Sequence, residues 1–333
     1  MSGPLVIAIP SKGRLKEQVE AWLMDCGLRL EVTGGARGYL ASLKGLPGVQ
    51  VRLLSAADIA KALDAGDIHL GVTGEDLLRE LGDDVDARVL LLKALGFGRA
   101  DLVTAAPKSW LDVDGMADLD DVAHDILART GRRMRVATKY LTQTRAFFAR
   151  HGVSEYRIVE SGGATEGAPA AGLAELVVDI TTTGATLAAN ALKVLGDGVI
   201  LRSQAQLAAS LRATWTPDAL VAAERLLRVA EARVSALNSA TLTWPPGAAD
   251  IEARTVGGLI ENGATRRPNG LLVEAAKAAD AALALTRAGL GPVTILQPEF
   301  VFDVACSAFT TLAARISDAQ VKNVAVRPDL SEN

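Results

Sequence analysis

The sequence predicts an α/β protein. Short apolar runs rich in β-branched residues, as at 5–9 and 176–178, suit strands that are buried on both faces. Longer stretches between them, such as 15–26, carry apolar residues at helical spacing. Turns rich in glycine and hydroxyl groups join strand to helix, as at 181–184. Regular alternation of the two kinds of segment is typical of the α/β class.

Length and composition narrow the class of function. A chain of 333 residues has room for two or three domains, and its hydrophobic content of 49% is ample for real cores. Aromatic residues make up only 4%, which argues against binding nucleic acid by base stacking. The net charge of -4 argues against a general polyanion-binding surface. Any bound phosphate is therefore expected to be held locally, by loops and a few basic residues.

The cysteines, the histidines and the N-terminal sequence indicate the cellular compartment and whether a metal site is expected. Cys26 and Cys306 form no metal or disulfide pattern, which favours a reduced, cytoplasmic setting. His69, His124 and His151 share no ligand spacing. The chain opens directly on a strand without a charged leader, and no apolar run reaches membrane-spanning length, so we expect no signal peptide and no membrane association.

The first strand, 5–9, leads into a turn that carries Lys12, Gly13 and Arg14, and a helix then runs to Gly27. Cations at a helix N-terminus oppose the helix dipole, so a bound anion would give Lys12 and Arg14 a purpose. The alternative is that both simply solvate the first helical turn.

The rest of the first half continues the alternation. Strands are expected at 49–54, 68–72, 88–95 and 101–106, with a helix at 56–63 that Ser55 caps and another that opens at 73–76. Asp76 is explained equally well as a capping acid and as a substrate contact. Arg37 lies in a glycine-rich loop and is either a phosphate contact or a solvated side chain. We expect the chain to leave its first domain near Pro107.

A second α/β unit follows. It has expected helices at 118–129 and 142–149, strands at 135–138 and 156–159, and a glycine-rich segment at 161–169. Lys139 and Arg145 lie at its first strand-to-helix junction, which makes them a second candidate contact for nucleotide or phosphate.

The stretch 175–190 has the strongest signal. An apolar strand at 176–178 leads to Asp179, a run of threonines and Gly184, and a helix begins at about Thr186. Backbone N–H groups, the helix dipole and hydroxyl donors would converge there on an anion, so we interpret it as a phosphate cradle. Asp179 would accept from ribose hydroxyls or hold a cation. The alternative is an ordinary strand-turn-helix unit with threonine caps.

An acid followed by TTTGATL resembles the loop of phosphoribosyltransferases that holds the 5-phosphate of phosphoribosyl pyrophosphate (PRPP). Three other segments resemble ATP phosphoribosyltransferase, the first enzyme of histidine biosynthesis, and all four follow that family's order. They are GVTGEDL at 71–77, RVATKYLTQTR at 135–145 and SGGATEGAPAAGL at 161–173.

The resemblance implies two sets of site residues and one metal. The PRPP-binding set is Glu166, Asp179, Thr181, Thr182, Thr183, Gly184, Ala185, Thr186 and Leu187. The ATP-binding set is Lys12, Gly13, Arg14, Arg37, Gly74, Asp76, Lys139 and Arg145. For Glu166, the alternative is an acid in the first turn of a helix. Mg²⁺ is expected to bind through the substrate phosphates, with Asp179 as a candidate ligand.

The resemblance also implies the domain organisation. Two lobes similar to bilobed periplasmic binding proteins are expected, lobe I from 1–107 with 195–237 and lobe II from 108–194. The long helix expected at 216–237 carries a clear apolar stripe. The residue composition changes at 238–333. Long-form members of the family carry a ferredoxin-like domain there that senses histidine, so we expect an α+β regulatory domain. Dimers that assemble into hexamers, or a hetero-oligomer with a regulatory subunit, are both implied.

In the implied reaction, N1 of the adenine of ATP attacks the anomeric carbon of PRPP and expels pyrophosphate, without a covalent enzyme intermediate. Three alternatives remain at this point. The chain could be a non-catalytic small-molecule binding domain of the periplasmic-binding type, a phosphoribosyltransferase that uses another base, or a catalytically silent regulatory paralogue.

Overall fold

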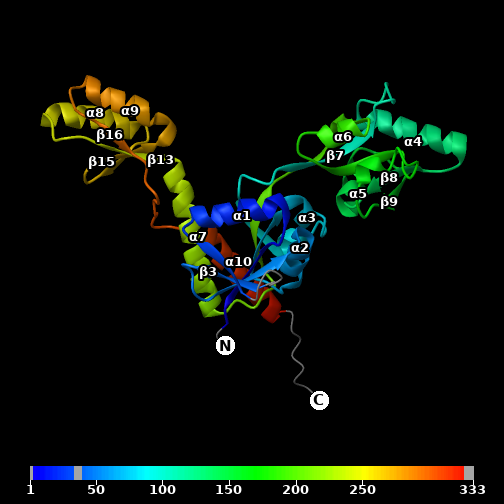
Figure 1. The fold of residues 1–333 in the computed structure, drawn as a ribbon, viewed down its shortest axis with the longest axis horizontal. Helices are drawn as coiled ribbons and strands as arrows, with labels where there is room; N and C mark the ends of the chain where they lie inside the picture. The colour runs from blue at the N-terminus through cyan, green and yellow to red at the C-terminus, as the bar shows by residue number, and fades with distance from the viewer. Residues whose placement is uncertain (1–2, 34–39, 326–333) are drawn as a thin grey trace, which may run out of the picture.

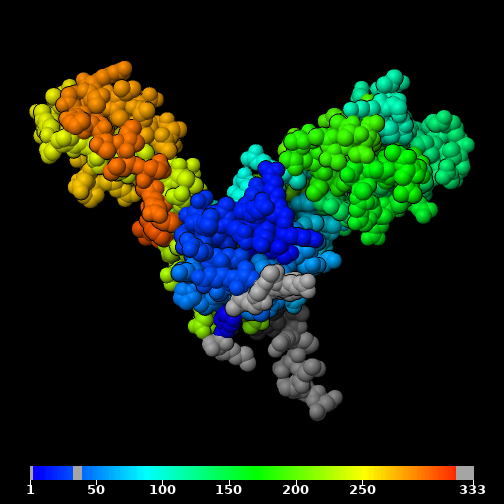
Figure 2. All heavy atoms as spheres, viewed as in Figure 1, coloured from blue at the N-terminus to red at the C-terminus, as the bar shows by residue number. Residues whose placement is uncertain are grey.

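The computed structural model describes residues 3–33 and 40–325, which contain three β-sheets. Each sheet belongs to its own body, and the central body lies between the other two (Figure 1). In the space-filling view the second and third bodies stand apart on opposite sides of the central one (Figure 2). The described segments include no helix with the length and apolarity that crossing a bilayer requires.

The central body, lobe I, is built on a seven-stranded sheet of order β2-β3-β4-β1-β5-β12-β6. Its strands are β1 (Leu5–Pro10), β2 (Arg29–Thr33), β3 (Leu40–Lys44), β4 (Val49–Leu54), β5 (Leu70–Gly74), β6 (Val89–Ala94) and β12 (Ala205–Ser210). Its helices are α1 (Gly13–Asp25), α2 (Ala56–Ala65), α3 (Glu75–Arg79), the 3₁₀ turn η1 (Val85–Ala87) and α7 (Pro217–Leu237). Every residue of β1 is buried, as its apolar run predicts.

The second body, lobe II, has a five-stranded sheet of order β11-β7-β10-β8-β9. Its strands are β7 (Ala100–Pro107), β8 (Met134–Thr138), β9 (Tyr156–Glu160), β10 (Leu176–Thr181) and β11 (Leu192–Ser203). Its helices are α4 (Met116–Thr130), α5 (Leu141–Arg150), the 3₁₀ turn η2 (Thr165–Gly167) and α6 (Ala185–Ala189). The chain crosses between the lobes twice, at 95–99 and at Gln204. The expected two-lobed α/β fold is therefore confirmed. The expected boundaries of lobe II, 108 and 194, were wrong, because β7 and all of β11 pair within its sheet and extend the lobe to 100–203.

The third body is a four-stranded sheet of order β14-β15-β13-β16, with every neighbouring pair antiparallel. Along the chain it runs β13 (Ser239–Thr243), α8 (Ala249–Glu261), β14 (Thr265–Arg267), β15 (Gly270–Glu274), η3 (Ala275–Lys277), α9 (Ala278–Arg287) and β16 (Thr294–Leu296). This strand-helix-strand-strand-helix-strand order is the ferredoxin-like pattern. The expected ferredoxin-like unit is thus present, over residues 239–296.

The expected range for this unit, 238–333, was too long. Helix α10 (Ser307–Ala325) returns to lobe I, where Leu312 and Ile316 join the buried cluster beneath the seven-stranded sheet. A second apolar stripe at helical spacing, which begins at Ala308, explains this return. The ferredoxin-like unit is therefore tied to lobe I at both of its ends, through α7 and through the segment 297–306.

Candidate active site

The predicted cradle lies where β10 ends and α6 begins. Gly184 has φ +76°, a left-handed conformation that strains other residues, and its N–H donates to Oγ1 of Thr181 at 2.8 Å. The turn leaves Thr182, Thr183 and Thr186 exposed. The carbonyl of Arg99, at the end of the first crossing segment, accepts from the Thr182 hydroxyl at 3.3 Å. The cradle therefore presents hydroxyl groups next to the first crossing segment.

Two details of the cradle differ from the expectation. Helix α6 has only five residues, so its dipole is small, and local N–H groups and hydroxyls must supply most of any attraction for an anion. Leu187 is 3% exposed and packs into the core of lobe II, so only its backbone is available to a ligand. Among the residues at this turn, the side chains available to an anion are those of the threonines.

Asp179 brings together residues from three predicted segments. It is partly buried on β10, and burial raises the pKa of its carboxyl; nearby Glu166 adds to the rise, whereas Lys139 opposes it. The nearby hydroxyl of Thr165, a residue that is 3% exposed, also opposes the rise in the pKa of Asp179. Asp179, Glu166 and Lys139 thus share one electrostatic neighbourhood beside the cradle.

The turn that carries Glu166 has an unusual backbone. Ala164 adopts φ +49°, a left-handed conformation that costs free energy in a residue with a Cβ. The next residue, Thr165, donates to Oγ of Ser161 at 3.1 Å and so closes the turn. Strain of this kind persists where the surrounding structure fixes a functional loop, and here it orients the segment next to Asp179.

Asp76 and Gly74 have structural partners. Asp76 is 6% exposed; its Oδ1 accepts from Oγ of Ser203 at 2.9 Å and its Oδ2 from the hydroxyl of Tyr140 at 2.7 Å. A Cβ on Gly74 would lie 2.2 Å from Oδ1 of Asp76, so the glycine makes room for this carboxylate. Both oxygens of Asp76 are therefore occupied by the protein in this structure. No sequence pattern indicated that Tyr140 and Ser203 would bind this carboxylate.

The other predicted ATP contacts remain dispersed. Lys12 precedes α1, and Gly13 and Arg14 are its first two residues; all three are exposed, and within the described residues neither Lys12 nor Arg14 forms an ion pair. Arg145 acts on Tyr156 of β9, whose pKa is raised by burial and lowered by Arg145. Arg37 lies outside the described residues.

A divalent cation would fit beside Asp179, because burial and Glu166 both disfavour that carboxylate's charge and a cation would relieve the cost. The described ranges hold no cluster of three or more acidic, histidine or cysteine side chains arranged for a metal. Phosphate oxygens would have to complete the coordination.

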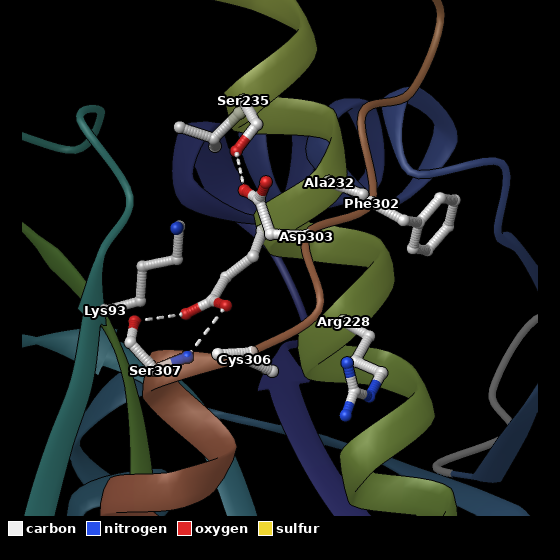
Figure 3. Close-up of a pocket in the computed structure, with 11 residues that line it drawn as sticks. Lys93, Arg228, Ala232, Ser235, Phe302, Asp303, Cys306 and Ser307 are labelled. Carbon is white, nitrogen blue, oxygen red and sulfur yellow. Dashed lines mark hydrogen bonds between the residues drawn. The ribbon is translucent and has the colours of Figure 1, made fainter. Parts of the chain in front are cut away.

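A cavity lies away from the cradle. It measures about 340 Å³ and is enclosed by α7, β6 and the segment before α10 (Figure 3). Lys93, Arg228, Phe302 and Asp303 line it, and no predicted site residue does. The groups suited to bind a phosphorylated substrate lie at the cradle and not in this cavity, so the cavity does not identify the site.

The family model described as ATP phosphoribosyltransferase matches residues 55–229, just over half of the chain. An ATP phosphoribosyltransferase of Caulobacter vibrioides is 68% identical over 303 residues, which cover 91% of this chain and 95% of that protein. One from a Bradyrhizobium species is 59% identical over 236 residues, 71% of this chain and 73% of that protein.

Among solved structures, the ATP phosphoribosyl transferase (HisG:HisZ) complex from Thermotoga maritima contains a similar chain. The match has a TM-score of 0.52 and 27% sequence identity, and it covers 68% of this chain and 98% of that chain.

Proposed function

The chain belongs to the ATP phosphoribosyltransferase family, and from that premise we propose which of its residues bind each substrate. The family's reaction is the first step of histidine biosynthesis, in which adenine N1 of ATP attacks the anomeric carbon of PRPP and gives phosphoribosyl-ATP and pyrophosphate. The chain is therefore a pentosyl-transferring enzyme, and a non-catalytic binding domain is not favoured.

The cradle binds the 5-phosphate of PRPP in this proposal. The observation that carries it is the left-handed turn at Gly184, which leaves the hydroxyls of Thr182, Thr183 and Thr186 exposed at the end of a buried strand. The full set that we assign to this loop is Thr181, Thr182, Thr183, Gly184, Ala185, Thr186 and, through its backbone, Leu187. Hydroxyl and N–H donors to an ionised phosphate make strong hydrogen bonds.

Asp179 and Glu166 hold the ribose of PRPP. Both lie next to the cradle, and carboxylates accept hydrogen bonds from ribose hydroxyls. Mg²⁺ would bind to the pyrophosphate oxygens with Asp179 as a ligand, and when bound it neutralises charge on the leaving group. Lys139, which is exposed beside them, would add a positive charge on the same side.

ATP binds at the exposed turn formed by Lys12, Gly13 and Arg14 of lobe I, with Arg37 and, on α5 of lobe II, Arg145 as further candidates. The lone pair of adenine N1 forms the new bond to the anomeric carbon while the bond to pyrophosphate breaks and its electrons leave with that group. No covalent enzyme intermediate is needed. The protein's contribution is to align the two substrates and to neutralise charge.

Regulation is proposed for the ferredoxin-like unit at 239–296, with histidine as its feedback ligand. The Thermotoga maritima chain is described as part of a complex, which supports assembly with a regulatory subunit as the other route. Either a homo-oligomer, from dimer to hexamer, or such a hetero-oligomer in the cytoplasm is consistent with this proposal.

Isothermal titration of PRPP and of ATP into the Thr183→Ala variant tests the cradle. Loss of one donor to a charged phosphate should weaken PRPP binding about tenfold, and ATP binding should change less than about threefold. Thr130→Ala is the matched control, because Thr130 is an exposed threonine at the end of α4 in the same lobe. Equal PRPP affinities for the two variants would refute the assignment.

A further inference from the structure

One histidine lies where three strands of lobe I and the segment before α7 come together. His69 immediately precedes β5, and its main chain is already part of the sheet. Its N–H donates to the carbonyl of Val6 on β1 at 2.9 Å, and its carbonyl accepts from the N–H of Ser210 on β12 at 2.9 Å. The imidazole adds two contacts of its own, to residues 63 and 145 positions away in the chain. His69 therefore joins distant segments through both its backbone and its ring.

The two ring nitrogens of His69 have opposite roles. Nδ1 lies 3.0 Å from the backbone nitrogen of Val6, and because a backbone N–H can only donate, Nδ1 must accept. Nε2 lies 3.1 Å from the carbonyl oxygen of Thr214, and because a carbonyl can only accept, Nε2 must carry the proton. Only the neutral imidazole in its Nε2–H form satisfies both partners. The chemistry of these partners thus fixes both the charge and the tautomer of the ring.

The surroundings hold the ring of His69 in this position. Trp215 packs edge-on against it with ring centroids 4.9 Å apart, and the Trp215 indole donates to the carbonyl of Ser210 at 2.9 Å. The segment 211–216 also lies close against the end of α2, where a Cβ on Gly66 would be 3.0 Å from the carbonyl oxygen of Arg212. While this segment stays in place, the ring has little freedom to exchange its partners.

Protonation of His69 would leave one of its contacts without a partner. The imidazolium carries a proton on each nitrogen, so an N–H would face the N–H of Val6 in either orientation of the ring. Val6 is 8% exposed, so water has little access to replace the lost acceptor. A buried donor without a partner is costly. The contact to Thr214 can persist in the cation, whereas the contact to β1 cannot.

The environment of His69 favours the neutral ring. Burial lowers the pKa of the imidazole and the positive charge of Arg52 on β4 lowers it further, whereas the contact with Thr214 opposes both effects. Arg52 is held at this end of the lobe because it donates to the carbonyl of Asp67 at 3.1 Å.

The acids at this end of the lobe do not balance a charge on His69. Asp64, at the end of α2, pairs with Arg88, and its carbonyl accepts from another cation, Arg212, at 3.1 Å. The side chain of Asp67 is exposed to solvent. Within the described residues, no carboxylate lies at ion-pair distance from the His69 ring. A cation at His69 would therefore have no direct counter-ion.

We infer that His69 is a pH-sensitive latch that joins the start of β1 to the segment before α7 while its ring is neutral and opens at β1 when the ring takes up a proton. This inference goes beyond the catalytic function and rests on neither substrate loop. Because the folded protein binds the proton less readily than the unfolded chain does, the stability that His69 contributes is fully present above the unfolded-state pKa of about 6.5. It is lost as the pH falls from that value through the lowered folded-state pKa.

Long-range proton–nitrogen NMR of the wild type between pH 8 and pH 5 tests the latch, because the chain has only three histidines. His124 is the internal control, since it is exposed on α4 and its pKa is raised by the carbonyl and the carboxylate of Asp120. We expect the Nε2–H form of His69 at pH 8 and a titration midpoint below that of His124. The amide signal of Val6 should move with the His69 midpoint, and the amide of Leu5, which donates to the carbonyl of Gly48, should move less.

Urea unfolding of His69→Gln and His124→Gln gives a second measurement. At pH 7.5 the His69→Gln variant should lower the folding equilibrium constant about fivefold, as loss of one hydrogen bond to a buried N–H implies. This deficit relative to the wild type should narrow at pH 5.5, where the wild type loses the same contact. The deficit of His124→Gln should instead grow toward acid, because a raised pKa stabilises the fold when the histidine is protonated.

Three results would overturn the inference. They are an Nδ1–H form of His69 at pH 8, a His69 midpoint at or above that of His124, and a Val6 amide signal that does not follow the His69 titration. A deficit of His69→Gln that grows toward acid, as for His124→Gln, would contradict it as well. The NMR measurements use the wild type alone, so they decide the question even if His69→Gln does not fold.

Discussion

Glu231 of α7 caps the start of α10. Along the chain, the whole ferredoxin-like unit separates these two helices. Its Oε1 accepts from the N–H of Ala308 at 2.8 Å and from the hydroxyl of Ser307 at 2.7 Å, and its Oε2 accepts from the N–H of Ser307 at 3.1 Å. Figure 3 shows Ser307, which lines the cavity, and its hydrogen bonds to this carboxylate. One carboxylate thus fixes the point where the chain returns to lobe I after its third body.

Replacing Glu231 by Gln should loosen the docking of α10. Loss of an ionised cap typically costs about 1 kcal/mol, and we expect that decrease in the free energy of unfolding, with faster proteolytic cleavage in 297–306. The control is Glu224→Gln, which breaks an exposed pair between Glu224 and Arg228 and should cost less than about 0.5 kcal/mol. Equal effects of the two substitutions would show that the cap does not hold the helix.

The Glu231 effect should depend on pH. Partial burial disfavours the ionised form, but the N–H of Ala308 and the hydroxyl of Ser307 outweigh it, so the pKa of Glu231 is lowered in the folded protein. A lowered carboxyl pKa stabilises the fold above the unfolded-state value, about 4.3, and the contribution is lost as the pH falls through the folded value. Urea unfolding should therefore separate wild type from Glu231→Gln at pH 7 and bring them together in acid.

Asp179→Asn should stabilise the fold at neutral pH, whereas Glu231→Gln should destabilise it. Burial and Glu166 raise the pKa of Asp179, so its ionised form destabilises the fold above that raised pKa. The amide should therefore increase the free energy of unfolding at pH 7.5, and the gain should shrink as the pH falls and Asp179 becomes protonated. Asp121→Asn, at an exposed site on α4, is the control and should change little. A less stable Asp179→Asn variant at pH 7.5 would contradict this account of the site.

Gly270 is a specific requirement of the ferredoxin-like unit. It has φ +152°, and a Cβ there would lie 1.9 Å from the carbonyl oxygen of Leu242 on the neighbouring strand. Gly270→Ala should therefore cost at least about 2 kcal/mol in thermal or urea unfolding. Gly257→Ala in α8 is the matched control, because its Cβ would meet open space and alanine favours a helix by about 1 kcal/mol. A tolerated Gly270→Ala would contradict the strand geometry.

The sequence predicted the elements that local pattern specifies. Helix α7 was expected from its apolar stripe, and in the structure the hydroxyl of Thr216 caps it by accepting from the N–H of Ala219. The cradle strand was expected from its Val-rich run, and β10 is buried in the middle of its sheet. The ferredoxin-like unit followed from family resemblance alone, because its strands are short and its sequence is rich in glycine and arginine.

What the sequence missed depends on contacts between distant segments. Strand β12 has the sequence AQLAAS, without a β-branched or aromatic residue, yet all six of its residues are buried because β5 and β6 flank it. Tyr140 and Asp76 are 64 residues apart, so no periodicity could pair them. From its position at a helix start, Asp76 could be a capping acid or a substrate contact, and only the fold shows that its carboxylate accepts from Tyr140 and Ser203.

The most direct test of the central claim is mass-spectrometric detection of phosphoribosyl-ATP. The full-length protein would be incubated with PRPP, ATP and Mg²⁺, with and without histidine, beside its Thr183→Ala and Asp179→Ala variants. We predict product from the wild type and at least about tenfold less from each variant, in line with lost contacts to charged or transition-state groups. Product formed equally well by all three proteins would contradict the account, because catalysis would then not depend on the cradle.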